Sequence, residues 1–255
     1  MRPAIRRQSP PNLAAGFRDG RPAPATPLGP DVARIFQSRD ARDISAAAKE
    51  LLRTHGSCIT AMDLGDLMVS FGKKKGAKRL TLDDELISLL PLGRVTPRVD
   101  QAMQILRAAH TPPTEASRRL IGCFADQLCA AESLSMVQIS SCFNALVKCE
   151  ADAVAAILRA LAAHLGRCKA EFGGQAIGNI LYGLQSMKSA DAAVCTVLSV
   201  LANKMRQSKD NLSAQNIGNA LYGLRRMSSD VPEVRAVLSE MAPKIGQSKE
   251  VLSAS

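Results

Sequence analysis

The sequence predicts an all-α protein, an α-solenoid of stacked helix-turn-helix repeats with a period of about 38–40 residues. The main observation is an internal repeat, because the segments 175–184 and 215–224 are nearly identical in sequence. Their separation of about 40 residues is typical of stacked helical repeats. Strand signals are almost absent, since β-branched runs are short and no hairpin dipeptide separates alternating segments. Apolar residues also recur at helical spacing between the repeats.

The N-terminal segment, residues 1–42, differs in composition from the rest of the chain. It contains seven of the 13 prolines, its first acidic residue is Asp19, and its arginines include Arg2, Arg6 and Arg7. Such a segment cannot bury enough apolar surface to fold alone, so we expect a disordered-like basic tail. Its composition fits an organellar transit peptide, and it also fits a basic arm that binds an anionic partner.

Residues 43–255 are predicted to form the solenoid, built from about five helical pairs and a final incomplete repeat. Each repeat has one anchor position, and successive anchors recur at intervals of about 35–40 residues. The first two repeats match the pattern least well. The predicted anchors are Asp66, Gln101, Ser141, Asn179 and Asn219.

A second amphipathic helix is expected ahead of each later anchor helix, because apolar residues there recur at helical spacing. Ser213 is well placed to cap the first turn of the last anchor helix. Asp83, Asp84 and Glu85 are typical of an acidic first helical turn, which the helix dipole favours. The expected second helices cover residues 82–90, 116–130, 154–165 and 194–205.

The sequence also predicts an open face near its last residues. Residues 247–254 match 207–214, so the next anchor helix would begin at Ser255. We expect the last helix, about Val231 to Gly246, to leave part of its apolar stripe uncovered. Another segment, a protein or RNA is then expected to cover that stripe at Val237, Met241 and Leu252.

Three positions of each anchor helix form a candidate functional line, because residues at i, i+3 and i+7 lie along one side of a helix. In the last repeat the line contains Asn219, Tyr222 and Arg226. The opposite side is expected to be core, with Ile217, Ala220, Leu221, Leu224 and Met227. The matching trios are Asn179, Tyr182 and Ser186; Ser141, Asn144 and Lys148; Gln101, Gln104 and Ala108; and Asp66, Val69 and Lys73.

The chemistry of this line suits single-stranded nucleic acid. Amides and hydroxyls bond unstacked base edges, a tyrosine offers a stacking platform, and Arg or Lys binds phosphate. A structural interpretation stands beside it, in which Asn179 and Asn219 bond a neighbouring backbone and Tyr182 and Tyr222 pack on the next helix. The paired glycines 178, 183, 218 and 223 are expected to permit close helix packing, since glycine is otherwise costly inside a helix.

A basic run follows the first anchor helix. It contains Lys73, Lys74, Lys75, Lys78 and Arg79. The run is either a solvated loop or a phosphate contact, and the net charge of +10 with a pI of about 9.5 favours phosphate.

Other classes of function have no support in the sequence. No apolar run reaches the roughly 18 residues that span a bilayer. The seven cysteines form no C-x-x-C pair and the three histidines are scattered, so no metal or cofactor site is predicted. Most cysteines are expected to be small core residues in a reducing compartment. His110 and His164 are interpreted as structural or surface residues, and no catalytic group is predicted.

The motif in residues 212–224, followed by a second helix after Val231, resembles the octotricopeptide repeat family. It is similar also to the heptatricopeptide-type repeats of protist organelles. The resemblance implies a non-enzymatic α-solenoid that binds organellar RNA, most plausibly an accessory mitochondrial ribosomal protein that holds fragmented rRNA beside other proteins of the complex. A plastid is the alternative location, and a protein–protein scaffold of an organellar assembly or membrane complex is the alternative function. Asn144, Gln104 and Val69 stand where the family motif has an aromatic residue.

Overall fold

The computed structural model describes residues 41–72, 83–108 and 114–247. Regular structure in these residues is entirely helical, with no strand, which confirms the predicted all-α class. Among the described residues, the helices before residue 110 are α2 (Ala41–His55), α3 (Ala61–Gly72), α4 (Asp84–Leu89), α5 (Val99–Ala102) and the 3₁₀ helix η2 (Met103–Arg107). The others are α6 (Glu115–Ala130), α7 (Met136–Ala145), α8 (Ala151–Arg167), α9 (Gly174–Gly183), α10 (Ala192–Gln207), α11 (Ala214–Leu224) and α12 (Pro232–Gly246).

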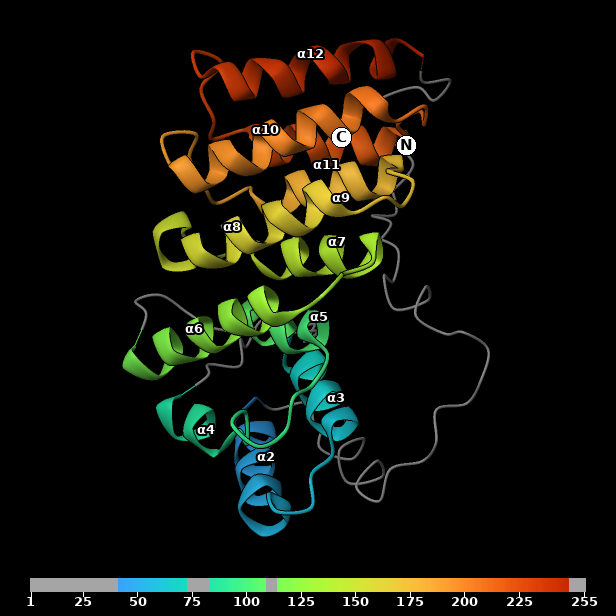
Figure 1. Ribbon diagram of the computed structural model, residues 1–255. Coiled ribbons are helices and arrows are strands. Elements are labelled where there is room, and N and C mark those ends of the chain that lie inside the picture. Colours follow the sequence, from blue (N-terminus) through green and yellow to red (C-terminus); the bar gives the residue numbers. More distant parts are fainter. Residues whose placement is uncertain (1–40, 73–82, 109–113, 248–255) are drawn as a thin grey trace, which may run out of the picture.

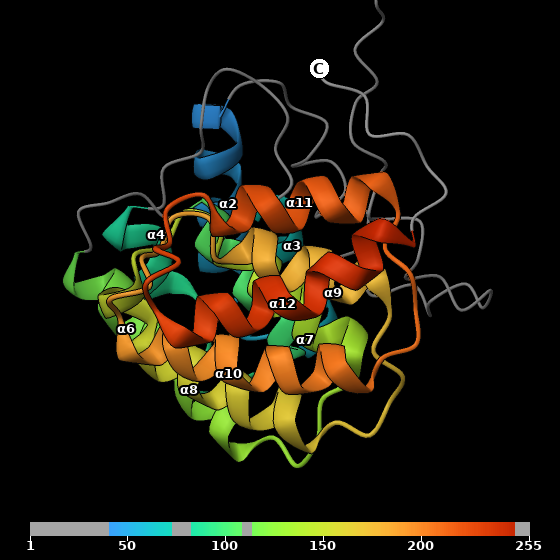
Figure 2. The same ribbon diagram turned by 90° about the horizontal axis from the view of Figure 1, so that it is seen from above.

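The helices form two layers, and the chain alternates between them (Figure 1). We call α3, α5 with η2, α7, α9 and α11 the anchor layer, because these elements contain the five predicted anchors. Each packs on the next member of the layer. We call α2, α4, α6, α8, α10 and α12 the partner layer, in which successive helices also pack on each other. Figure 2 shows α11 on one side of the molecule and α8 and α10 on the other.

Side-chain caps fix where several helices begin. The hydroxyl oxygen of Ser213 accepts a hydrogen bond from the Asn216 N–H, as the sequence predicted. Thr114 caps α6 in the same way, and Ser135 forms a reciprocal capping box with Gln138 at the start of α7. Asp83 caps α4, so the predicted acidic first turn is confirmed. These caps satisfy N–H groups that have no partner within the helix.

The second anchor element departs from the expected α-helix, because α5 ends at Ala102 and continues as the 3₁₀ helix η2. Gln104 explains part of this change. Its side-chain amide donates to the Asp100 carbonyl at 3.3 Å, the group that its own backbone N–H would use in an α-helix. The same amide also donates to the Ser141 hydroxyl of α7 at 2.9 Å.

Two expectations about apolar side chains are wrong. Val237 and Met241 were expected to leave α12 partly bare, but they are 0% and 1% exposed because α12 packs on α10. Leu221 was expected in the core, but it is 46% exposed, whereas Leu181 at the same repeat position is fully buried. The exposed apolar side chain therefore lies on α11, at Leu221, and not on α12, where the sequence analysis expected it.

The core between the layers consists mainly of Leu, Ile, Val, Met and Ala. Cysteine contributes less than expected. Among the seven, Cys142 is buried, Cys123, Cys149, Cys168 and Cys195 are half-buried, and Cys58 and Cys129 are exposed, so the core prediction is wrong for most of them. The described helices include none with the length and apolarity required to cross a bilayer.

Candidate nucleic-acid interface

A line of polar and aromatic side chains crosses the anchor layer. It occupies the position three residues after the last four anchors: Gln104, Asn144, Tyr182 and Tyr222, whereas the apolar Val69 follows the first anchor, Asp66. Gln104 and Asn144 are each only 8% exposed, because both lie between neighbouring helices. The guanidinium of Arg107 joins them, donating to Asn144 Oδ1 at 3.1 Å and to Gln104 Oε1 at 3.4 Å. At this end the line is therefore a structural contact, which the sequence interpretation had proposed only for the asparagines and tyrosines of the last two repeats.

At the other end of the line, the two tyrosines stack on each other. The ring centroids of Tyr182 and Tyr222 are 5.9 Å apart and the ring planes differ by 25°. The guanidinium carbon of Arg225 lies 3.8 Å from the centroid of the Tyr222 ring. Aromatic pairs of this kind contribute about 0.5–1.5 kcal/mol beyond their buried area, and an exposed cation–π contact about 0.5–1 kcal/mol. Tyr222 remains 46% exposed at the edge of α11.

Glycines allow the anchor helices to approach closely enough for these contacts. A Cβ at Gly223 would lie 2.1 Å from the Leu181 carbonyl oxygen, and one at Gly183 would lie 2.2 Å from that of Phe143. The backbones of α7, α9 and α11 therefore nearly touch at these two positions. A Cβ at Gly178 would lie 3.1 Å from the Asn216 Cα, whereas a Cβ at Gly218 would meet no atom of another element within 4 Å. Close packing is confirmed for Gly183, Gly223 and Gly178, and is wrong for Gly218.

The two anchor asparagines do not form the expected structural ladder. Within the described part of the chain, neither Asn179 nor Asn219 makes a side-chain hydrogen bond, and both are half-buried. The Ser141 anchor is bonded to the neighbouring anchor element through Gln104. The amide groups of Asn179 and Asn219 therefore do not contribute side-chain hydrogen bonds within the described part of the chain.

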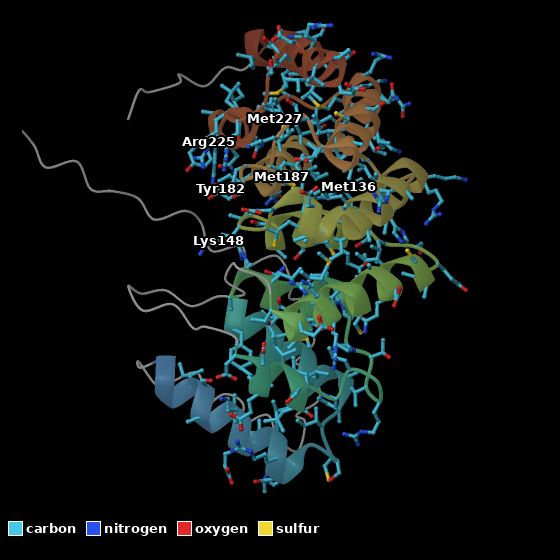
Figure 3. The ribbon with its side chains drawn as sticks, turned by 90° about the vertical axis from the view of Figure 1, so that its left-hand side faces the viewer. Met136, Lys148, Tyr182, Met187, Arg225 and Met227 are labelled. Atoms are coloured by element: carbon cyan, nitrogen blue, oxygen red, sulfur yellow. The ribbon has the colours of Figure 1, made fainter. Side chains whose placement is uncertain are left out.

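The third position of the line is partly used inside the protein. The Ser186 hydroxyl donates to the Val147 carbonyl at 2.6 Å, and Arg226 donates to the Ser186 carbonyl at 3.3 Å. Lys148 and Arg226 are both exposed. Figure 3 shows Lys148, Tyr182 and Arg225 one above another on the anchor-layer side, while Met136, Met187 and Met227 lie closer to the partner layer.

The charged side chains near the end of the anchor layer lie outside its last three helices. The helices α7, α9 and α11 contain no acidic residue. Basic side chains flank them, including Arg107, Lys148, Arg225 and Arg226. Burial lowers the pKa of the Arg107 guanidinium, and the nearby Tyr182 acts in the opposite direction. An arginine stays charged in proteins even so, but the segments between helices from α7 onward also carry acidic residues, such as Glu150, Asp191 and Asp230.

A second set of periodic cations holds the partner layer together, and the sequence interpretation missed it. Lys204 donates to the Cys168 carbonyl at 2.5 Å, and Lys244 donates to the Ser208 carbonyl at 2.6 Å. These carbonyls are the C-caps of the preceding partner helices, α8 and α10. His164 lies 2.7 Å from the Leu128 carbonyl at the end of α6 in the same manner. These three side chains recur with the period of the repeat, so the sequence contained the signal that could have identified them.

Several predicted site residues lie outside the described residues. They are the basic run Lys73, Lys74, Lys75, Lys78 and Arg79, the tail arginines Arg2, Arg6 and Arg7, together with Leu252 and His110. Conversely, the sequence interpretation did not select Arg107 or Arg225. Both stand six residues after an anchor, so the repeat alignment contained a signal for them.

The described residues include no metal-binding cluster, and burial raises the pKa of two of their cysteine thiols. They contain no group of three or more His, Cys, Asp or Glu side chains placed to hold a metal ion. Burial raises the pKa of the Cys149 thiol to about 12 and raises the pKa of Cys142 as well. Both thiols are therefore protonated and weakly nucleophilic at neutral pH.

Comparisons with known proteins returned no match from protein-family models, curated proteins or solved structures.

Proposed function

We propose that the protein is a non-enzymatic α-solenoid that binds single-stranded RNA across its anchor layer. The observation that carries this proposal is the exposed end of the side-chain line, where stacked tyrosines, uncommitted asparagine amides and arginines share one side of α9 and α11. Stacking on an aromatic side chain is worth about 1–3 kcal/mol per base, amides can bond base edges, and arginines bind phosphates.

The proposal extends to the biological setting through the sequence resemblance alone. The protein is then an accessory mitochondrial ribosomal protein, or its plastid counterpart, that holds rRNA beside other proteins of the particle. The basic tail and the run at residues 73–79 would add phosphate contacts to those of the anchor layer. Repeat proteins commonly use such an extended surface for binding.

A protein–protein scaffold is the second candidate, and one observation favours it. Leu221 and Tyr222 are each 46% exposed on neighbouring positions of α11, and exposed apolar side chains of this kind mark protein contacts as well. Three features favour RNA over this alternative: the absence of acid on three anchor helices, the two unbonded asparagine amides, and the guanidinium over the Tyr222 ring.

The native complex provides the test of the RNA function. The protein is purified from its source and sedimented before and after treatment with ribonuclease. An RNA-bound protein sediments with a large particle, and nuclease treatment shifts it to a smaller one while releasing protected RNA fragments. Sedimentation that nuclease leaves unchanged, with no RNA recovered, would assign the protein to a scaffold instead.

A further inference from the structure

The exposed edge of α11 carries a more specific site than the anchor layer as a whole. Leu181 is fully buried, and Tyr182 is half-buried beneath Tyr222. The same two positions on α11, Leu221 and Tyr222, are 46% exposed. Gly218 lies one turn earlier on α11, also with open space where a side chain would stand. An aromatic ring, an aliphatic side chain and open space thus occur together on α11.

The polar groups around the Tyr222 ring form no hydrogen bond or ion pair with the described part of the protein. The hydroxyl groups of Tyr182 and Tyr222 make no hydrogen bond to any described residue, and no carboxylate there pairs with Arg225. This separates Arg225 from Arg226, which donates to the Ser186 carbonyl, and from Arg107, which donates to Asn144. Among the described residues, the Arg225 guanidinium is held only by its contact with the ring.

We propose that Tyr222 is the stacking site for one unpaired RNA base, which takes the place of the Arg225 guanidinium on the ring. This inference rests on the proposed function. Tyr182 supports Tyr222 by stacking on it, and Arg225 moves from the ring to the phosphate beside the base. A base is a larger flat surface than a guanidinium, and the exchange brings the cation to the phosphate, a stronger partner than the ring. The base gains a stacking partner without a change in the helices.

Tyr182 is not the equivalent site, although it has the same repeat position. Its ring is already covered by Tyr222, and it lies close to the buried end of the line at Arg107 and Asn144. The structure therefore distinguishes two residues that the sequence repeat makes equivalent.

The chain offers a direct test, because it contains two tyrosines and no tryptophan. The full-length protein is bound to oligouridylate that contains 5-iodouridine, irradiated, and digested with trypsin. Iodouracil forms adducts mainly with the aromatic ring that stacks on it. Trypsin separates the tyrosines, since Tyr182 falls in residues 170–188 and Tyr222 in residues 210–225.

We expect the adduct on residues 210–225. Replacing Tyr222→Leu should abolish that adduct and weaken binding about tenfold, as loss of one stacked base predicts. Tyr222→Phe keeps the ring and should keep the adduct, which guards against a variant that fails to fold. Arg225→Gln removes the competing cation, so the adduct should form at least as efficiently although total affinity falls about two- to threefold.

Three results would overturn the inference. RNA that binds in fluorescence anisotropy but never labels residues 210–225 shows that binding occurs elsewhere and leaves the proposed function intact. Labelling of residues 170–188 alone would place the base on Tyr182. A dimer that forms without RNA and shields Tyr222 from labelling would make this edge a protein contact. Absence of any RNA binding in the anisotropy measurement would instead reject the proposed function itself.

Discussion

The first and last parts of the chain join their partner-layer helices by different chemistry, although both follow the same two-layer path. From α7 to α12, anchor helices nearly touch at glycines, and lysines bond the C-caps of preceding partner helices. In the first part, α3 likewise approaches η2 closely at Gly72, where a Cβ would lie 2.4 Å from the Gln104 carbonyl oxygen, but α2 and α4 are joined by ion pairs rather than by lysine–carbonyl bonds. A stack of helices thus tolerates changes in its contacts as long as each apolar face remains covered.

The ion pairs of the first part centre on α4. Lys49 of α2 lies 2.7 Å from Asp83 and 2.8 Å from Glu85, and Arg53 pairs with Glu85 as well. Most of these side chains are exposed to solvent by about half, so salt and pH act on this part more than on α7–α12. The comparison therefore predicts where the fold is sensitive to backbone crowding and where it is sensitive to charge.

The largest effect is expected from an added methyl group at a helix crossing. Gly223→Ala places a Cβ 2.1 Å from the Leu181 carbonyl oxygen, so α9 and α11 must separate. We expect a loss of about 3 kcal/mol in the free energy of unfolding, measured by urea denaturation. Gly218→Ala is the matched control on the same helix, because no atom lies within 4 Å of its Cβ. It should stabilise by about 0.5–1 kcal/mol through helix propensity alone.

A smaller effect is expected at the lysine contacts of the partner layer. Lys244 is 8% exposed and donates to the carbonyls of Ser208 and Asp210. Lys244→Met keeps most of the apolar stem but removes both charged hydrogen bonds, so we expect a loss of about 2 kcal/mol. Lys188→Met is the control, because Lys188 is exposed and should change stability by less than about 0.5 kcal/mol. Equal effects in the two variants would mean that the helix-end contacts contribute nothing specific.

Substitutions in the basic run between α3 and α4 test whether the first part of the chain binds RNA, rather than how stable it is. Replacing Lys73, Lys74, Lys75, Lys78 and Arg79 by Gln should weaken RNA binding and flatten its salt dependence. Each phosphate that is no longer neutralised reduces the slope of log affinity against log salt by about 0.7 for a single strand. Fluorescence anisotropy of a labelled oligonucleotide at several salt concentrations measures the slope. A slope that does not change would identify the run as a solvated loop.

The weakest effect is expected from the α2–α4 ion pairs, and its size depends on pH. Burial tends to raise the pKa of Asp83, but hydrogen bonds from Lys49 and the Leu86 N–H outweigh burial and lower it below 3.8. Hydrogen bonds from Lys49 and Arg53 lower the pKa of Glu85 below 4.5. A lowered carboxyl pKa stabilises the fold above the ordinary value, and this contribution is lost as pH falls below it.

The variant Lys49→Met isolates that contribution. The difference in unfolding free energy between the original protein and the variant should be constant near neutral pH and shrink as pH falls below about 4.5. Hydrogen bonds to Asp83 and Glu85 also raise the pKa of Lys49, so its share of the stability would be lost only above 10.5. A difference that grows as the solution becomes more acidic would contradict the assignment of these ion pairs.

The sequence predicted much of the fold, because helices and their caps depend on local patterns. The internal repeat and the Ser213 cap were sufficient to place α10, α11 and α12. Burial depends on which neighbours a helix has, so Leu221 and Met241 were assigned to the wrong environments. The 3₁₀ turn at Gln104 depends on a bond to Ser141 in another helix, which periodicity does not reveal.

The candidate site was predicted only in part. The repeat selected Tyr182 and Tyr222, but it gave both the same role, whereas the structure leaves only Tyr222 largely open. Arg225 was missed because two of its equivalents, Gln185 and Val147, lack its charge, although a third, Arg107, shares it. Its importance comes from a 3.8 Å contact with the ring, which depends on rotamers rather than on sequence spacing.

The central claim, that the anchor layer binds RNA, is tested most directly by two variants of equal charge. One carries Lys148→Gln, Arg225→Gln and Arg226→Gln on the anchor-layer side. The other carries Arg119→Gln, Arg159→Gln and Arg235→Gln on α6, α8 and α12 of the partner layer, all exposed. The affinity for single-stranded RNA is measured by anisotropy at several salt concentrations. We predict that the first variant binds about tenfold more weakly, with a salt slope reduced by about 2, while the second stays close to the original protein. Equal losses in both variants would show that RNA follows net charge alone and would contradict the claim.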